Sequence, residues 1–295
     1  MTQKRKKTIK QVIIKELRHV KKELQTLINF LFGLWSSKIS IRTSRRFGIT
    51  TNKRPMPVIV SLTSYGPRIA NAHYAVHSLL SQTVKPDHVI LWLTYGEPIT
   101  QQLADLCKRG LEIKYCDDLK SFKKIIPALQ TFPNSIIVTA DDDLIYKPKW
   151  LKKLYLSYLK ESGAIWCHRS YSLDLKEHDS LSPFRQRTKN RRATDAHGLI
   201  FLCSGAGILF PPDSLPTEVL NISMFKKLCF SCDDTWLTSM ALLNNMECKV
   251  VPKPYYDIIT VTKSQTSSLW RTNSSKQDEI IKAVFTHYNL YELVK

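Results

Sequence analysis

Four short runs of apolar, mostly β-branched residues occupy the first half of this chain, and segments with helical character alternate with them. The apolar runs lie at 57–63, 88–93, 111–115 and 135–140. We expect helices at 75–82, 101–109, 121–130 and 149–161, with Pro127 as a kink or an early stop in the third. Buried strands that alternate with helices indicate a parallel sheet. The sequence therefore predicts an α/β fold with a mostly parallel central sheet flanked by helices.

Polar residues follow three of these runs. The turn Ser64–Arg68 comes after the first run, the segment Asp117–Lys124 after the third, and Asp141-Asp142-Asp143 directly after the fourth. In open α/β sheets, ligands bind beyond the carboxyl ends of the strands. We therefore expect these three segments to converge on one site.

The three consecutive aspartates are the most informative motif. Adjacent carboxylates repel one another unless a cation or hydrogen-bond donors compensate. In an extended chain alternate residues face the same side, so Asp141 and Asp143 are expected to face one cleft and Asp142 another. Oxygen ligands of this kind suit Mg²⁺ or Mn²⁺. The alternative is a solvated acidic turn before the helix that begins at Lys149.

Glycine is scarce, with 9 residues in 295, and no glycine-rich phosphate-binding motif is present. Phosphate groups would have to be held by a metal ion or by cationic side chains. Arg68, Lys123 and Lys124 are the candidates because they lie at the predicted strand ends. Each of them, taken alone, is more commonly a solvated surface charge.

Two motifs in the second half of the chain add to the predicted site. Gly205 and Gly207 lie in an apolar, strand-like run at 201–212, where glycine marks either a close approach of a ligand or a tight bend. Asp233 and Asp234 begin a predicted helix, and one aspartate suffices as an N-cap. A second carboxylate directed at the cleft could act as general base on a sugar hydroxyl.

The net charge of +19 is concentrated at the N-terminus, because residues 1–54 hold 15 Lys and Arg and only two acids. An apolar stripe at helical spacing begins at Ile13, and the apolar run at 27–35 is too short to span a bilayer. We expect 1–54 to be a basic amphipathic helix and linker, and 55–295 to be the main domain. Residues 1–35 fit an anionic membrane surface. A short coiled coil or a helix packed on the main domain or on a protein partner is the second interpretation, and nucleic-acid binding is the third.

The remaining sequence patterns bear on the expected partners and on the location of the protein in the cell. No nucleic-acid-binding motif is present, so nucleic acid is not an expected partner. The seven cysteines are an odd number and no cleavable secretory signal is found, which indicates the cytoplasm, either free or at the inner face of the membrane. The basic stretch 185–192 is interpreted as a solvated mobile loop. The alternatives are a lid over a diphosphate, or contact with a phosphorylated or lipid-linked acceptor.

Four ordered motifs resemble one family. They are V-S-L-T-S-Y-G-P-R at 60–68, T-A-D-D-D at 139–143, S-G-A-G-I-L-F-P-P at 204–212 and C-D-D-T-W-L at 232–237. Together they resemble bacterial glycosyltransferases with the GT-A (Rossmann-like) fold, near the family-2-like enzymes that build capsule, lipopolysaccharide and other surface glycans. The resemblance covers about 55–270.

The resemblance implies a function and roles for the residues. It implies transfer of a sugar from a nucleotide-diphosphate sugar to a glycan or lipid-linked acceptor, with Mn²⁺ or Mg²⁺ as cofactor. Asp143 and Asp141 are the implied metal ligands, and Asp234 or its neighbour Asp233 is the implied catalytic base of an inverting enzyme. The implied nucleotide-sugar-binding residues are Ser64, Tyr65, Arg68, Lys123, Lys124, Asp141, Asp142, Gly205 and Gly207.

The sequence departs from the family-2 pattern in two places. The second predicted strand ends in L-T-Y-G-E at 93–97, where the common family-2 enzymes carry an acidic pair, so the nucleotide is not assigned. The Q-x-x-R-W motif is absent, which argues against a processive synthase. A metal-dependent nucleotidyltransferase is the main alternative, since it also uses paired carboxylates and Mg²⁺ but releases pyrophosphate. A basic nucleic-acid-binding protein is the weaker one.

Overall fold

The structure is a computed structural model that describes residue 16 and residues 47–176, 180–261 and 276–294. The amphipathic helix and membrane surface expected within 1–35 lie outside this part, apart from Glu16, and the division at residue 54 remains a prediction. Among the helices of the described part, none is both long enough and apolar enough to cross a bilayer.

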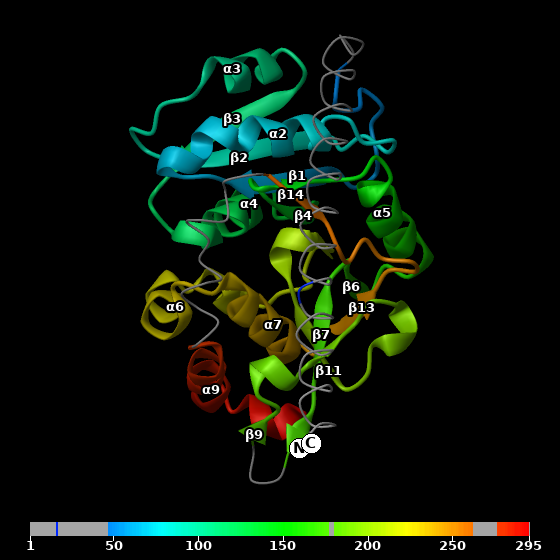
Figure 1. The fold of residues 1–295 in the computed structure, drawn as a ribbon, viewed down its shortest axis with the longest axis vertical. Coiled ribbons are helices and arrows are strands. Elements are labelled where there is room, and N and C mark those ends of the chain that lie inside the picture. Colours follow the sequence, from blue (N-terminus) through cyan, green and yellow to red (C-terminus); the bar gives the residue numbers. More distant parts are fainter. Residues whose placement is uncertain (1–15, 17–46, 177–179, 262–275, 295) are drawn as a thin grey trace, which may run out of the picture.

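A seven-stranded sheet with the order β13-β6-β12-β4-β1-β2-β3 forms the centre of the fold (Figure 1). Its strands are β1 (Val58–Thr63), β2 (His88–Thr94), β3 (Leu111–Cys116), β4 (Ile136–Asp141), β6 (Ala164–Cys167), β12 (Ile208–Phe210) and β13 (Glu247–Val250). Only β12 runs antiparallel to its neighbours in this sheet. The predicted α/β class with a mostly parallel central sheet is therefore confirmed.

Helices cover both faces of this sheet. One face packs against α2 (Ile69–Leu79), α3 (Gln101–Cys107) and α5 (Trp150–Lys160), and the other against α4 (Ile126–Thr131), α6 (Ile222–Cys229) and α7 (Asp233–Leu243). Helix α9 (Gln277–His287) packs on α6 and α7 (Figure 1). Successive residues of β1 alternate between the two cores, because side chains of a strand point to opposite faces: Val58 and Val60 join one and Ile59 the other. This double burial explains why the strands read as continuous apolar runs.

Smaller sheets complete the fold. They are formed by β10 (Thr188–Lys189), β7 (Ser170–Leu173) and β11 (Leu199–Leu202); by β14 (Ile259–Thr260) and β5 (Leu144–Ile145); and by β8 (Leu175–Lys176) and β9 (Ser180–Leu181). The basic stretch 185–192 contains β10 and is thus not a free loop. Arg187 within it is buried, and its guanidinium lies 3.0 Å from the carboxylate of Asp278.

The predicted helix at 121–130 is two short helices. A 3₁₀ helix, η2 (Lys120–Lys124), precedes α4, and Pro127 lies in the first turn of α4. Proline fits a first turn because its missing N–H has no partner there in any helix. Pro127 therefore starts a helix rather than kinking one. The helix expected at 75–82 likewise begins earlier, at Ile69, directly after the 3₁₀ helix η1 (Gly66–Arg68).

The strand-like run 201–212 is interrupted by a turn. β11 ends at Leu202, the 3₁₀ helix η5 (Ser204–Ala206) follows, and β12 begins at Ile208. Gly207 lies between them with φ of 109°, in the left-handed region that side chains disfavour. The indole Nε1 of Trp150 also donates a hydrogen bond to the carbonyl of Ala206 at 2.8 Å. The tight-bend interpretation therefore accounts for Gly207.

Replacing Gly207 with Ala is expected to destabilise the protein. A Cβ at this position would lie 2.5 Å from Nε1 of Trp150, and the positive φ adds backbone strain. Together these effects should lower the free energy of unfolding by about 2–4 kcal/mol, measured by urea denaturation. Gly163→Ala is the matched control, because its Cβ would meet no atom within 4 Å. Equal stability of the two variants would contradict the assigned packing.

Candidate active site

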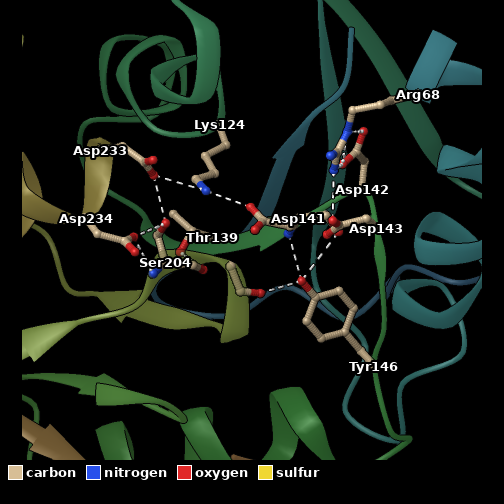
Figure 2. A network of polar contacts seen from close by, with 11 residues as sticks. Arg68, Lys124, Thr139, Asp141, Asp142, Asp143, Tyr146, Ser204, Asp233 and Asp234 are labelled. Atoms are coloured by element: carbon tan, nitrogen blue, oxygen red, sulfur yellow. Dashed lines mark hydrogen bonds and ion pairs between the residues drawn. The ribbon is translucent and has the colours of Figure 1, made fainter. Parts of the chain in front are cut away.

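The carboxyl ends of β1 and β4 bring the first predicted motifs together. Thr63 pairs with Asp141 in the parallel register, so Ser64 and Asp142 leave the sheet side by side. Figure 2 shows that Asp141, Asp142 and Asp143 lie in one polar network with Arg68, Lys124, Asp233 and Asp234. The structure therefore brings these segments together at one edge of the sheet, as the sequence predicts.

Asp142 and Arg68 form the first part of this network. Nε of Arg68 lies 3.1 Å from both carboxylate oxygens of Asp142, and its Nη2 also donates to Asp142. The hydroxyl of Ser64 donates to the same carboxylate at 2.5 Å. Asp142 is only 5% exposed, so it is not part of a solvated acidic turn. Its contacts orient Arg68 at the strand ends.

Asp143 shares Arg68 with Asp142. Its Oδ2 lies 3.1 Å from Nη2 of Arg68. Burial and then the neighbouring carboxylate of Asp141 raise the pKa of Asp143 to about 6, although Arg68 acts in the opposite direction. The expected alternation, with Asp141 and Asp143 facing one cleft and Asp142 another, does not describe these contacts. β4 ends at Asp141, and the next two residues form a turn, so the strand periodicity no longer applies to them.

Lys124 joins Asp141 to the second acidic motif. Its Nζ lies 2.6 Å from Oδ1 of Asp141 and 3.0 Å from Oδ2 of Asp233 (Figure 2). Burial alone would lower the pKa of Lys124, but Asp141 and then Asp233 outweigh it, so the pKa is raised. The ammonium is therefore charged at neutral pH. It connects the end of β4 to the start of α7.

Lys123 extends to a different part of the site, although it is adjacent to Lys124 in sequence. Its Nζ donates to Oγ1 of Thr94 at 2.7 Å and to the carbonyl of Ser64 at 3.4 Å. Carboxylates of Glu97 and Asp118 lie 3.9 Å away. Lys123 is thus held at the carboxyl ends of β1 and β2.

Asp233 and Asp234 occupy the first turn of α7. The N-cap position is Cys232, and no side chain caps this helix, so the aspartates are not its capping residues. Both carboxylates contact Ser204: its hydroxyl lies 2.7 Å from Oδ2 of Asp233 and 2.6 Å from Oδ1 of Asp234. The amide of Ser204 also donates to Oδ1 of Asp234 at 2.8 Å.

The two carboxylates differ in proton affinity. Burial and then repulsion by Asp233 raise the pKa of Asp234 to about 7. Burial alone would also raise the pKa of Asp233, but Lys124 and then Ser204 outweigh it and lower the pKa. At neutral pH, Asp234 is therefore the group of this pair that can gain or lose a proton, as a general base must.

Gly205 allows the backbone to approach Asp141 closely. A Cβ on Gly205 would lie 2.0 Å from Oδ2 of Asp141. The hydroxyl of Tyr146 accepts from the amide of Asp141 at 2.7 Å and donates to the carbonyl of Gly205 at 2.6 Å. These contacts fix Asp141 between β4 and η5.

Three residues of the network were not singled out from the sequence. Tyr146 and Ser204 connect the acidic motifs to the chain around Gly205, and Thr139 donates to the carbonyl of Ser204 at 3.0 Å. Ser204 begins the S-G-A-G motif, so its position beside Gly205 was an available signal. Tyr146 had no such signal, because a tyrosine after an acidic turn has no special pattern.

The donor set of this network is compatible with a divalent cation of the Mg²⁺ or Mn²⁺ type. Asp141 and Asp143 supply carboxylate oxygens, the ligands that such ions prefer. Within the described residues, no cluster of three or more His, Cys, Asp or Glu side chains could hold a metal ion alone. Mg²⁺ commonly takes only one or two carboxylates and completes its shell with substrate phosphates. The raised pKa of Asp143 also indicates a carboxylate that a cation would stabilise.

Comparisons with known proteins give structural likeness only. No protein-family model matches the chain, and no curated protein matches it. One similar structure is the mannosyltransferase PcManGT from Pyrobaculum calidifontis in complex with GDP-Man and Mn²⁺, with 12% identity and a TM-score of 0.49, covering 91% of this chain and 74% of that one. Another is the inositol-1-phosphate CTP transferase from T. maritima, with 9% identity and a TM-score of 0.45, covering 79% and 98%. At these values the likeness identifies neither a family nor an activity.

Proposed function

We propose that this protein is a metal-dependent, inverting glycosyltransferase of the GT-A type. It would transfer a sugar from a nucleotide-diphosphate sugar to a glycan or a lipid-linked acceptor. The observation that carries the proposal is the network in which Lys124 joins Asp141, at the end of β4, to Asp233, and Ser204 joins Asp233 to Asp234 at the start of α7. Asp143 follows Asp141 by two residues and contacts Arg68 at the same edge of the sheet. Such a network combines a site for an anionic, metal-bound donor with a carboxylate able to accept a proton near neutral pH.

The donor would bind at the strand ends. Asp143 and Asp141 would hold the Mn²⁺ or Mg²⁺ ion, which, when bound, stabilises the negative charge of the leaving diphosphate. Arg68 already lies at this edge through its contacts with Asp142, so its guanidinium is available to a phosphate oxygen after a small rearrangement. Ser64, Lys123 and Lys124 contribute to the same edge, and Gly205 lies against Asp141 on its far side, where Gly207 provides the bend that follows.

The nucleoside would lie toward the ends of β2 and β3. Tyr95 and Tyr115 are 68% and 40% exposed there, and their rings stack with centroids 6.4 Å apart. Tyr65 is also exposed, beside Arg68. Exposed aromatic rings suit stacking with a nucleobase. This surface supports a nucleotide-linked donor.

Asp234 would act as the general base. It would take the proton from an acceptor hydroxyl while that oxygen attacks the anomeric carbon from the face opposite the leaving group. Ser204 fixes the orientation of the carboxylate through its amide and its hydroxyl. Direct displacement of this kind inverts the configuration of the sugar.

The biological setting is part of the proposal. The resemblance of the four sequence motifs supports a role in the synthesis of cell-surface polysaccharide. Residues 1–35 would attach the enzyme to the inner face of the cytoplasmic membrane, where lipid-linked acceptors are found. Salt-sensitive binding of the full chain to anionic vesicles, lost on removal of residues 1–35, is the expected outcome. Equal binding of the truncated chain would contradict this role for 1–35.

A screen of nucleotide sugars tests the proposed reaction. The full chain is incubated with each donor, with Mn²⁺, with Mg²⁺ or with EDTA, and the released phosphorylated product is identified. We expect one donor to yield a nucleoside diphosphate only when the metal is present. Release of pyrophosphate from a nucleoside triphosphate and a sugar phosphate would instead identify a nucleotidyltransferase. Turnover that is unaffected by EDTA would contradict the role of the metal.

A further inference from the structure

Lys124 contacts only one of the two adjacent aspartates of α7. Its side chain is 4% exposed, and its ammonium lies 3.0 Å from Asp233 and 2.6 Å from Asp141. No ion pair within 4 Å joins it to Asp234 among the described residues. A buried ammonium is stable only where carboxylates compensate for its lost hydration. The geometry therefore makes Asp233 a fixed counter-ion of Lys124 and distinguishes it from Asp234.

The contacts of Ser204 indicate that this pair of aspartates holds a proton. A hydroxyl has a single proton to donate, yet Oγ of Ser204 lies within 2.7 Å of both carboxylates. One of these two short contacts therefore needs a proton that belongs to a carboxyl group. Asp233 faces the ammonium of Lys124, which favours its ionised form. The arrangement that satisfies all the contacts has the hydroxyl donating to Asp233 and a protonated Asp234 donating to the hydroxyl.

Within the part of the chain that the structure describes, few other charges act on Asp234. The thiols of Cys232, at the N-cap of α7, and of Cys203, beside η5, are its further titratable neighbours there. Burial raises the pKa of Cys232 to about 12 and that of Cys203 well above its ordinary value, so both are neutral at neutral pH. The charges that decide the protonation of Asp234 are therefore those of Asp233 and Lys124.

We propose that Lys124 is a positioning residue that makes Asp234, rather than Asp233, the carboxyl that exchanges the shared proton and that can act as a base once it is deprotonated. Its ammonium holds Asp233 as a carboxylate, and the negative charge of Asp233 together with burial leaves the shared proton on Asp234. The inference deepens the proposed glycosyl transfer and, as far as it concerns catalysis, rests on it. The assignment of the proton itself does not depend on any substrate.

Lys124 would also connect the donor-binding part of the site with the part that holds the proposed base. The same ammonium holds Asp141, the carboxylate proposed to face the metal-bound donor. Loss of its charge would leave the buried carboxylate of Asp233 and the partly exposed carboxylate of Asp141 without this counter-ion. Lys124 thus keeps the donor side and the base at a fixed separation without touching the reacting atoms.

The proton assignment can be tested by NMR titration of ¹³C-labelled aspartate side chains in the full chain without ligand. We expect one buried carboxyl to titrate near pH 7, and to disappear from the spectra of Asp234→Asn. In Asp233→Asn the same resonance should persist and titrate at lower pH, because the repelling charge is gone. If instead the resonance near pH 7 is absent from Asp233→Asn and present in Asp234→Asn, the proposal is overturned.

The role of Lys124 is tested in the same spectra with Lys124→Met. Removing the ammonium should move the titration of Asp234 at least one unit toward alkaline pH, since a charge that favours ionisation is lost. Lys124→Arg, which keeps the charge, should restore the titration to within half a unit of the parent. Lys123→Met is the matched control, a neighbouring buried lysine with other partners, and should leave this titration unmoved.

The possible outcomes separate this proposal from the proposed function. A titration in Lys124→Met that is unmoved, or moves toward acid, overturns the role of Lys124 even if the enzyme transfers sugar. If Lys124→Met does not fold, the proposal is decided by the comparison of Asp233→Asn with Asp234→Asn. A failure to turn over any nucleotide sugar, with the titrations as expected, counts against the glycosyltransferase and leaves the proton assignment standing.

Discussion

Replacing Asp234 with Asn is expected to lower kcat by about 10³-fold, with little change in the affinity for the nucleotide-sugar donor. Asn keeps a side-chain oxygen that can accept from the amide of Ser204, as Asp234 does now. It cannot accept a proton from an attacking hydroxyl. Initial rates over a range of donor concentrations, read as released nucleoside diphosphate, measure the effect on kcat separately from that on KM.

The control for this substitution is Asp105→Asn. Asp105 is an exposed residue of α3 that pairs with Lys108, far in the sequence from both acidic motifs. Its variant should retain the parent rate. A kcat of Asp234→Asn within a factor of ten of the parent would remove Asp234 from the role of base.

The pH dependence of the parent enzyme is expected to reflect the same carboxyl. Because the pKa of Asp234 is raised to about 7, kcat/KM should fall as the pH decreases below 7, where the base becomes protonated. In Asp234→Asn this acidic limb should be absent from the residual activity. A limb that remains unchanged in the variant would belong to another group.

Although Asp234→Asn should lower the activity, we expect it to raise the free energy of unfolding. A carboxyl whose pKa is higher in the folded than in the unfolded chain binds more protons when folded, so stability decreases as the pH rises between about 4 and 7. Asp234→Asn removes this loss. At pH 8 it should be more stable than the parent by on the order of 2–4 kcal/mol, and at pH 4 about equally stable, in urea denaturation. Such a gain is typical when a functional group that destabilises the folded state is removed.

The fold was predictable because its strands carry a strong signal. Runs such as 135–140 are buried on both faces, so most of their residues are apolar, and the turn residues that follow mark their ends. The convergence of the motifs after β1 and β4 follows from the parallel register alone. The short helices η2 and α4 were less predictable, because Pro127 is compatible with either a break or a start.

The pairing of charges within the site could not be predicted from sequence. Lys123 and Lys124 are adjacent and chemically identical, yet one contacts Thr94 and the other Asp141 and Asp233. Which lysine faces which carboxylate depends on the 3₁₀ geometry of η2, whose residues do not follow the α-helical period. The turn at Asp142 and Asp143 similarly ends the strand alternation.

The largest effect on the donor side is expected from Asp143→Asn. If Asp143 is a ligand of the divalent ion, its loss removes several kcal/mol of stabilisation of the leaving group, and each 1.36 kcal/mol corresponds to a factor of ten in rate. We expect the Mn²⁺-dependent rate to fall by about 10³-fold. The Mn²⁺ concentration that gives half of the maximal rate should rise at least tenfold.

Asp142→Asn is the matched variant, since Asp142 precedes Asp143 and is buried to a similar degree. Its main contacts are with Arg68 and Ser64, so its loss should raise the KM for the donor while leaving the Mn²⁺ dependence as in the parent. If the Mn²⁺ dependence changes in Asp142→Asn and not in Asp143→Asn, Asp142 would be the metal ligand in place of Asp143.

The Mn²⁺ requirement of the parent should also depend on pH. Since burial and Asp141 raise the pKa of Asp143 to about 6, protons should compete with the metal at lower pH. The parent should therefore need more Mn²⁺ at pH 5.5 than at pH 7.5, a difference that Asp143→Asn should lack.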